Sequence, residues 1–296
     1  MIWNRILSLL LVLLVLGCDN ASPAVEEAPL PGEPIAKSAK RGIAYNLQDA
    51  ADLDALKTGV SWWYNWHHAT TTPSAWTTTY QMEFLPMLWG HNAQTDFAAV
   101  KAFILARPGI GYLLLMNEPN LTDQANMTPQ RAAEEWVKYE QLAAELESAG
   151  RPITLVGPAM TWGTMAGHAD PVFWLDQFIV WYKAANNGRE PRIDHLAFHW
   201  YDYGLEGQLN RLQKYGKPIW VTEMANWNSQ IDTIVEQKQQ MTEMVAMLEA
   251  RDDVFRYAWF IGRMSGSDPH HTSLFNAASG SLTELGQHYL SLPYGN

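Results

Sequence analysis

Short apolar segments alternate with longer amphipathic ones from residue 42 onward in this chain of 296 residues. Such alternation is typical of strands and crossover helices in a parallel sheet. Several short segments are apolar without a break, as in residues 112–116 (YLLLM), which is typical of strands covered on both faces. We predict eight strands, at residues 42–46, 59–66, 83–89, 110–118, 153–158, 193–200, 217–223 and 255–261.

The intervening segments carry helix signals, which are clearest in residues 128–150. Thr128 and Pro129 provide a cap and a first helical residue, and Gly150 ends the segment. Eight strands with helices between them, and no second linker, predict one α/β domain at residues 42–296, folded as a single (β/α)8 TIM barrel. Such a barrel needs about 250 residues, a length that this chain supplies.

The first 18 residues differ from the rest in composition. Arg5 supplies positive charge, and residues 6–16 are apolar apart from Ser8. This run is too short for a membrane-spanning helix and predicts a secretion signal. Residues 15–18 (VLGC) resemble the processing box of bacterial lipoproteins, which predicts lipidation of Cys18. An ordinary signal peptide with an incidental cysteine is the alternative.

Cys18 is the only cysteine, so the exported chain cannot form an intrachain disulfide and depends on its apolar core. Residues 19–41 contain four prolines together with Ala, Glu and Lys, a composition that buries too little apolar surface to order itself. We therefore expect a flexible tether between a lipid anchor and the barrel. The protein would lie at a bacterial membrane, on its periplasmic or cell-surface side, and the choice of leaflet stays open.

Acidic residues outnumber basic ones in the expected mature chain. Without the leader and its Arg5, 19 basic residues face 31 acidic ones, a net charge near −12. Such a surface repels polyanions, which argues against nucleic acid, pectate and anionic lipid and favours a neutral ligand. The membrane is then a partner through the lipid anchor only. We expect a monomer without a cofactor.

Two glutamates stand at matching places in the predicted barrel. Glu118 ends the fourth predicted strand and Glu223 the seventh, 105 positions later. The carboxyl ends of barrel strands meet on one face, so both side chains are expected in one central pocket. Two carboxyl groups that flank a glycosidic bond are the usual equipment for its hydrolysis. Asn117 adds an amide that could bond a sugar 2-hydroxyl as the transition state forms.

Several runs in strand order resemble glycoside hydrolase family 128 of clan A, whose members are mainly β-1,3-glucanases. The similarity covers almost the whole segment from 42 to 290. The runs that carry it are 60–66 (VSWWYNW), 84–90 (FLPMLWG), 117–121 (NEPNL), 198–201 (FHWY), 218–223 (PIWVTE) and 256–260 (RYAWF).

The resemblance implies a retaining endo-β-1,3-glucanase that hydrolyses laminarin-like chains, with Glu118 as general acid and base and Glu223 as nucleophile. Glu118 must then hold a proton while Glu223 is ionised. Two alternatives stay open within the same chemistry: another clan A glycanase, acting on mixed-linkage glucan, xylan or mannan, and an exo-acting β-1,3-glucanase. A surface lipoprotein that binds glycan without turnover is the alternative from a different class.

Fourteen tryptophans are many for this length, and an indole can cover the apolar face of a neutral sugar. Four of them, within helical patterns or inside a strand, are expected to pack the core: Trp136, Trp174, Trp181 and Trp220. Seven fall at or just past predicted strand ends and are candidate sugar platforms: Trp62, Trp66, Trp89, Trp162, Trp200, Trp227 and Trp259.

Further polar residues are expected near the same face: Asn65, His199, Tyr201 and Asn226. Asn65 could bind a hydroxyl, and His199 could bond the nucleophile, a sugar or only its core neighbours.

The pairs at 67–68 and 270–271 are adjacent histidines, which point to opposite sides of an extended chain, so no metal is expected. Neither a phosphate-binding glycine loop nor a Gly-x-Ser-x-Gly elbow occurs.

Overall fold

The computed structural model describes residues 33–91 and 95–295 of the chain. The predicted signal peptide with Cys18, and the tether up to residue 32, lie outside these described residues. No helix in the described ranges is both long enough and apolar enough to cross a membrane.

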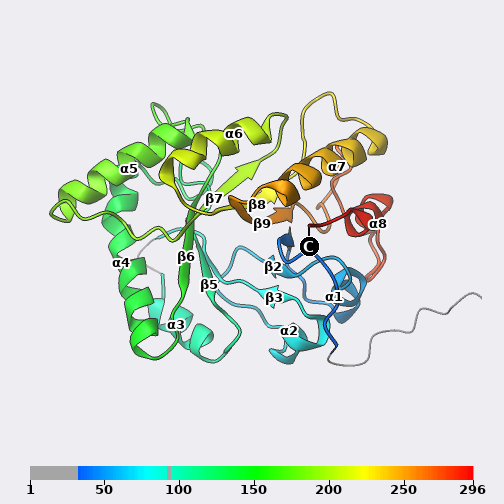
Figure 1. The fold of residues 1–296 in the computed structure, drawn as a ribbon, viewed down its shortest axis with the longest axis horizontal. Helices are drawn as coiled ribbons and strands as arrows, with labels where there is room; N and C mark the ends of the chain where they lie inside the picture. Colours follow the sequence, from blue (N-terminus) through cyan, green and yellow to red (C-terminus); the bar gives the residue numbers. More distant parts are fainter. Residues whose placement is uncertain (1–32, 92–94, 296) are drawn as a thin grey trace, which may run out of the picture.

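The described chain contains a nine-stranded sheet in the order β3-β2-β1-β9-β8-β7-β6-β5-β4, in which every paired neighbour is parallel. The sheet curls into a TIM-like barrel, with helices packed around its outside (Figure 1). The strands are β1 (Arg41–Ala44), β2 (Trp62–Tyr64), β3 (Glu83–Phe84), β4 (Met87–Leu88), β5 (Tyr112–Leu115), β6 (Thr154–Met160), β7 (His195–Trp200), β8 (Ile219–Met224) and β9 (Val254–Trp259).

The third predicted strand, residues 83–89, is two short strands in the structure. Leu85 and Pro86 separate β3 from β4, and proline has no N–H to continue a ladder. The backbone N–H of Leu85 still bonds Trp63 at 2.9 Å, and the carbonyl of Pro86 accepts from Leu114 at 2.9 Å. The two ends of the hydrogen-bonded sheet are therefore joined by the chain itself, at this point.

The helices begin where the sequence provides caps. Thr128 accepts the N–H of Arg131 at the start of α4, with Pro129 as the first helical residue, as predicted. Thr233 and Glu236 form a reciprocal capping box on α7. The helices are α1 (Ala50–Leu56), α2 (Ala75–Tyr80), α3 (Phe97–Leu105), α4 (Pro129–Ser148), α5 (Pro171–Ala185), α6 (Leu205–Leu212), the 3-10 helix η1 (Gln213–Tyr215), α7 (Ile234–Ala250) and α8 (Glu284–Ser291).

Buried side chains form two layers. The larger cluster lies between the strands and the helices, and includes Trp136 and Trp174. The smaller cluster is formed by side chains from eight strands, among them Trp62 and Trp220, and fills the barrel interior as side chains do in TIM barrels. The predicted core roles of Trp136, Trp174 and Trp220 are thus confirmed.

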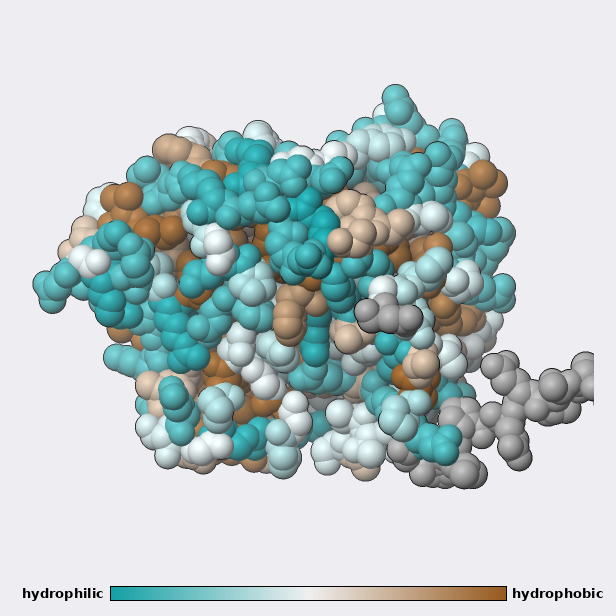
Figure 2. Space-filling view, viewed as in Figure 1, coloured by the Kyte–Doolittle hydropathy of each residue, from teal (hydrophilic) through white to brown (hydrophobic). Residues whose placement is uncertain are grey.

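Trp181 was expected to pack a helix onto the barrel, and this prediction is wrong. Its side chain is 44% exposed on α5, as are Phe173 at 46% and Val180 at 57%. Apolar patches are visible over α5 on the otherwise largely hydrophilic face in Figure 2. The helix turns its other side, with Trp174, Leu175 and others, toward the barrel.

The last residues of the predicted tether belong to the folded domain, so its expected end at residue 41 is too late. Lys37 donates to the carbonyls of Lys57, Val60 and Gln81 at 2.7–2.8 Å, and burial lowers its pKa to about 8. Arg41 is buried, lies in β1 and donates to carbonyls near the end of the chain. Lys37 and Arg41 hold this segment in place through hydrogen bonds to backbone carbonyls. A prediction from amino-acid composition counts apolar surface and does not include such bonds.

Candidate active site

Glu118 and Glu223 meet at one end of the barrel. Glu118 follows β5 and Glu223 lies near the end of β8, and their exposed fractions are 7% and 4%. One carboxylate oxygen from each, and one ring nitrogen of His199, all lie within 4.8 Å of one another. The prediction that two distant strand ends bring these carboxylates into one pocket is borne out by this geometry.

The backbone around Glu118 explains how two consecutive side chains reach the same cavity. In a regular strand, Asn117 and Glu118 would point to opposite faces. Met116 and Glu118 instead have φ values of 54° and 46°, in the left-handed region that non-glycine residues seldom adopt. Backbone bonds from Asn117 N to Trp89 O (2.7 Å) and from Glu118 N to Ala159 O (2.8 Å) hold this conformation. Both side chains consequently line the cavity.

His199 lies close to both carboxylates. Its Nδ1 lies 2.9 Å from Oε1 of Glu118 and 3.4 Å from Oε2 of Glu223, while its Nε2 lies 2.9 Å from Oγ1 of Thr222. The ring is completely buried in β7. Burial lowers the pKa of His199, but the charges of Glu223 and Glu118 outweigh it, so the pKa is raised above its ordinary value. Of the partners left open for His199, the structure shows the two carboxylates, with the hydrogen bond made to Glu118 and Glu223 close by.

Glu223 is surrounded by donors. Its Oε1 accepts from the hydroxyl of Tyr64 at 2.8 Å and from Nε1 of Trp66 at 2.7 Å, and its Oε2 accepts from the hydroxyl of Tyr201. Burial, and next the charge of Glu223, raise the pKa of both tyrosines well above 10, so both phenols keep their protons and can donate. Bonds to an ionised group are among the stronger ones in proteins. They fix the orientation of this carboxylate.

The glutamates open into two adjoining cavities that share Glu118, Gln124, Tyr201 and Trp227. The first, about 320 Å³, is completed by Trp66, Trp89, Asn117, Glu223 and Phe260. The second, about 510 Å³, is completed by Leu121, Thr161, Trp162, Trp200 and Asp202. Several aromatic rings line each cavity, and Tyr201 stacks on Trp227 with ring centroids 4.1 Å apart. Such a lining suits a neutral, ring-shaped ligand.

Five of the seven predicted sugar platforms line these cavities: Trp66, Trp89, Trp162, Trp200 and Trp227. Their contact with sugar stays a prediction.

The prediction is wrong for Trp62 and Trp259, which are both completely buried. Trp62 points into the barrel interior, packs on Trp220 and donates to the carbonyl of Lys40. Trp259 points to the helix layer and donates to the carbonyl of Thr272. Neither indole lines the two cavities, because Trp62 lies two residues before Tyr64 in the enclosed barrel interior and Trp259 is on the face of β9 that packs against the helices.

Some of the predicted polar residues line the two cavities and others do not. The amide of Asn65 donates to the carbonyl of Ala69 and to Asn46, and its oxygen accepts from His67, so it holds the loop after β2. Asn226 is completely buried and bonds Gln240 and Asn228. Neither asparagine lines the two cavities, whereas Asn117 does.

Sequence reasoning missed Tyr64 and Gln124. Tyr64 bonds the predicted nucleophile, and Gln124 lies in both cavities and accepts from Nδ2 of Asn117 at 3.2 Å. A signal for Tyr64 was present in its position at the end of a predicted strand, two residues before Trp66. Gln124 lies in the loop after Glu118 and has no comparable signal.

Among the described residues, Glu118, His199 and Glu223 form the one group of three or more His, Cys, Asp or Glu side chains close enough together to hold a metal ion. These atoms already bond one another and the donors around Glu223. The expectation that adjacent histidines point to opposite sides is wrong for His67 and His68, whose ring centroids lie 4.3 Å apart in the loop after β2. His270 and His271 each lie near a backbone carbonyl, that of Ile231 and that of Asp232.

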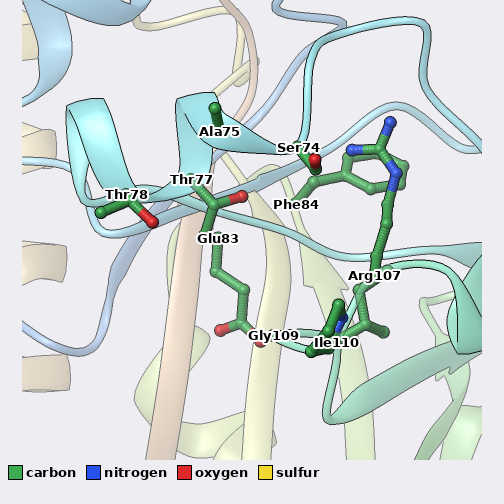
Figure 3. Close-up of a pocket in the computed structure, with 10 residues that line it drawn as sticks. Ser74, Ala75, Thr77, Thr78, Glu83, Phe84, Arg107, Gly109 and Ile110 are labelled. Carbon is green, nitrogen blue, oxygen red and sulfur yellow. The ribbon is translucent and has the colours of Figure 1, made fainter.

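Another cavity, about 380 Å³, lies away from the glutamates (Figure 3). Threonines of α2, Glu83 and Arg107 line it. Glu83 is paired with Arg256 at 2.8 Å, and Arg107 donates to the carbonyl of Thr72 at 2.7 Å. Its charged groups are therefore engaged within the fold, and it takes no part in the site of the two glutamates.

Comparison with solved structures shows the same architecture in enzymes. A family 128 (subgroup II) endo-β-1,3-glucanase from Pseudomonas viridiflava is 56% identical, with a TM-score of 0.82 over 88% of this chain and 100% of that one. A family 128 (subgroup III) curdlan-specific exo-β-1,3-glucanase from Blastomyces gilchristii, in complex with glucose, is 30% identical, with a TM-score of 0.63 over 89% of this chain and 100% of that one.

A curated relative is alkali-sensitive linkage protein 1 from Schizosaccharomyces pombe, 30% identical over 265 residues, which are 86% of this chain. The match spans only 45% of that protein. Residues 42–289 match the family model described as the glycosyl hydrolase catalytic core. With these matches and two carboxylates at the strand ends, the chain belongs to the glycosyl hydrolases, in glycoside hydrolase family 128.

Proposed function

We propose that this chain is a retaining endo-β-1,3-glucanase that uses Glu118 as general acid and base and Glu223 as nucleophile. The observation that carries the proposal is the short separation of the two carboxylates: an oxygen of Glu118 lies within 4.8 Å of an oxygen of Glu223. Retaining enzymes hold these groups about 5 to 5.5 Å apart, whereas inverting enzymes need about 6.5 to 9.5 Å for a water.

The surroundings of the two glutamates support unequal roles. Glu223 accepts three hydrogen bonds from neutral donors, which suits a carboxylate that attacks while ionised. Glu118 has His199 as its side-chain partner and is followed by Pro119 and a loop that borders both cavities.

The reaction then takes two steps. Glu223 attacks the anomeric carbon while the proton of Glu118 passes to the glycosidic oxygen, so the C–O bond breaks and the leaving chain departs as an alcohol. Water next attacks the same carbon, gives one proton to Glu118 and releases Glu223 from the ester. The product keeps the β configuration, and both glutamates return to their starting states.

Endo action is supported by the arrangement of the two cavities. They share Glu118 and differ in the rest of their lining, since one includes Glu223 and Trp89 and the other includes Trp162 and Trp200. A groove that accepts sugar on both sides of the scissile bond can cut within a chain. The Pseudomonas viridiflava relative is an endo-enzyme, and the Blastomyces gilchristii one is an exo-enzyme.

The test is a product analysis with purified protein on laminarin, mixed-linkage glucan, xylan and mannan. We expect new reducing ends on laminarin, a range of oligosaccharide lengths at early times, and β-anomers as the first product in an NMR time course. The Glu223→Gln variant is the matched control and should release none. First products with the α configuration would contradict retention, and release of one short product from the start would indicate exo action.

The glycan-binding alternative predicts a different result in the same assay. A binder would retain laminarin without new reducing ends on any of the four polysaccharides. The buried acid-base pair and the donors around Glu223 favour the enzyme, since binding needs neither.

We also propose that the protein is exported and anchored through a lipid on Cys18, on the basis of the VLGC run at 15–18. Expression in a bacterium with radiolabelled palmitate should label the wild type and not Cys18→Ala. Equal labelling of both proteins, or of neither, would contradict the proposal.

A further inference from the structure

We infer that Trp162, with Arg211 packed on its indole, binds a distal sugar of the leaving-group side, and that Arg211 is the positioning residue for this platform. The inference rests on the proposed function, because it uses the roles assigned to the two glutamates.

The side of the scissile bond follows from which glutamate each cavity contains. The cavity with Trp162 includes Glu118 and lacks Glu223, while the adjoining cavity includes both. The acid protonates the leaving oxygen, and the nucleophile attacks the sugar that stays behind. The space that continues beyond Glu118 alone is consequently the place for the departing chain.

The indole of Trp162 is exposed at the cavity wall and is held in place before any ligand binds. Its side chain is 51% exposed at the wall of this cavity. The guanidinium carbon of Arg211 lies 5.6 Å from the centre of its ring, within the range of a cation–π contact. Arg211 itself is held by both oxygens of Asp170, at 2.6 and 2.8 Å, and by Gln208 at 2.9 Å. Ordering the indole before binding reduces the entropy that a ligand must otherwise offset.

The loop that carries Trp162 is fixed to the loop that carries the acid. Nδ2 of Asn120 donates to the carbonyls of Thr161 (2.7 Å) and Ala169 (3.0 Å), and the carbonyl of Asn120 accepts from Thr164 and Met165. A Cβ at Gly163 would lie 2.2 Å from that carbonyl, so the close approach requires glycine. Asn120 is two residues after Glu118, and the distance from acid to platform is therefore set by the fold.

The chemistry of the platform fits an uncharged sugar. The positive charge of Arg211 is balanced by Asp170, which leaves the indole face as the main contact. An indole covers the C–H face of a pyranose without selecting charge. A neutral glucan unit fits these features.

The experiment compares two substrates with leaving groups of different length. Laminarihexaose can place several sugars on the leaving side, whereas 4-nitrophenyl β-laminaribioside places only its aryl group there. We expect Trp162→Ala to lower kcat/KM roughly tenfold on the hexaose, equivalent to about 1.4 kcal/mol, and to leave the aryl substrate within about twofold. Arg211→Ala should act in the same direction by about threefold, in keeping with one cation–π contact.

Two matched controls separate this effect from a loss of packing. Lys214→Ala removes another ion pair to α5, Lys214 with Asp176 at 2.8 Å, and Trp181→Ala removes an exposed indole from the same helix. Both should leave the ratio of the two kcat/KM values unchanged. An equal fall on both substrates for Trp162→Ala and Arg211→Ala, or no fall on the hexaose, would overturn the inference. A wild type that turns over neither substrate would overturn the proposed function, and this inference with it.

Discussion

The Nδ1 atom of His199 lies 2.9 Å from a carboxylate oxygen of Glu118, in a ring that no solvent reaches. The same nitrogen is 3.4 Å from Glu223, so one imidazole is near both acids. A cationic ring in this place would be stabilised by the negative charge of Glu223 and by its bond to Glu118. Its proton therefore affects the stability of the folded site.

The raised pKa of His199 predicts a pH-dependent contribution to stability. In the unfolded chain its pKa is about 6.5. Below that pH the contribution is fully present, and it is lost as the pH rises through the higher pKa of the folded state. We expect the free energy of unfolding of the wild type, from urea titrations, to fall more than that of His199→Asn as the pH is raised from about 6.5. Parallel curves for the two proteins would contradict a charged His199.

Tyr64→Phe should lower kcat and leave the fold intact. The change removes the hydroxyl that donates to Glu223 at 2.8 Å and keeps the ring in the barrel interior. A hydrogen bond to a charged group is worth about 1.5 to 3 kcal/mol, so we expect kcat/KM on laminarin to fall roughly 10- to 100-fold. The control is Tyr215→Phe, which removes a hydroxyl from Asp176 far from the cavities. Activity of Tyr64→Phe equal to that of the control would show that this bond contributes nothing to turnover.

Gly42→Ala should destabilise the protein. A Cβ at this position would lie 2.3 Å from the indole of Trp62, which is enclosed in the barrel interior. Overpacking of this kind typically costs about 1 to 3 kcal/mol. Gly207→Ala is the matched control, because nothing lies within 4 Å of its Cβ in α6 and alanine favours a helix by about 0.5 to 1 kcal/mol. In thermal unfolding, the Tm of Gly42→Ala should be lower than that of the wild type, and the Tm of Gly207→Ala should be higher. A Tm of Gly42→Ala equal to that of the wild type would refute the packing argument.

Much of the barrel could be predicted from local patterns. Apolar runs located the strands to within a few residues, and the Thr128-Pro129 signal located α4, because both depend on neighbours in sequence. The break at Pro86 followed from the missing N–H of proline, which the apolar pattern alone conceals. Residues 37–41 are held in place by bonds from Lys37 and Arg41 to carbonyls distant in the sequence. No local sequence pattern indicates that this segment is folded.

The site was predictable for the residues that carry charge and less so for the aromatic ones. Glu118 and Glu223 stand at strand ends, where a barrel brings side chains together. Whether an indole faces the barrel interior or a helix depends on strand phase, which separates Trp62 from Trp63. Whether an interior indole reaches the cavity depends on its position along the strand, which separates Trp66 from Trp62, and apolar runs reveal neither. Tyr64 acts through Glu223, 159 positions later in the chain, so its role required the folded structure.

The most direct test of the account is to trap the glycosyl-enzyme. A 2-deoxy-2-fluoro-β-laminaribioside with a dinitrophenyl leaving group should glycosylate the wild-type nucleophile, with release of dinitrophenolate, and the glycosyl-enzyme should hydrolyse only slowly, since the fluorine destabilises both transition states. Mass spectrometry of a proteolytic digest should then locate the added disaccharide on Glu223. Its presence on Glu118, or an enzyme that turns over laminarin and never forms the adduct, would contradict the roles assigned to the two glutamates.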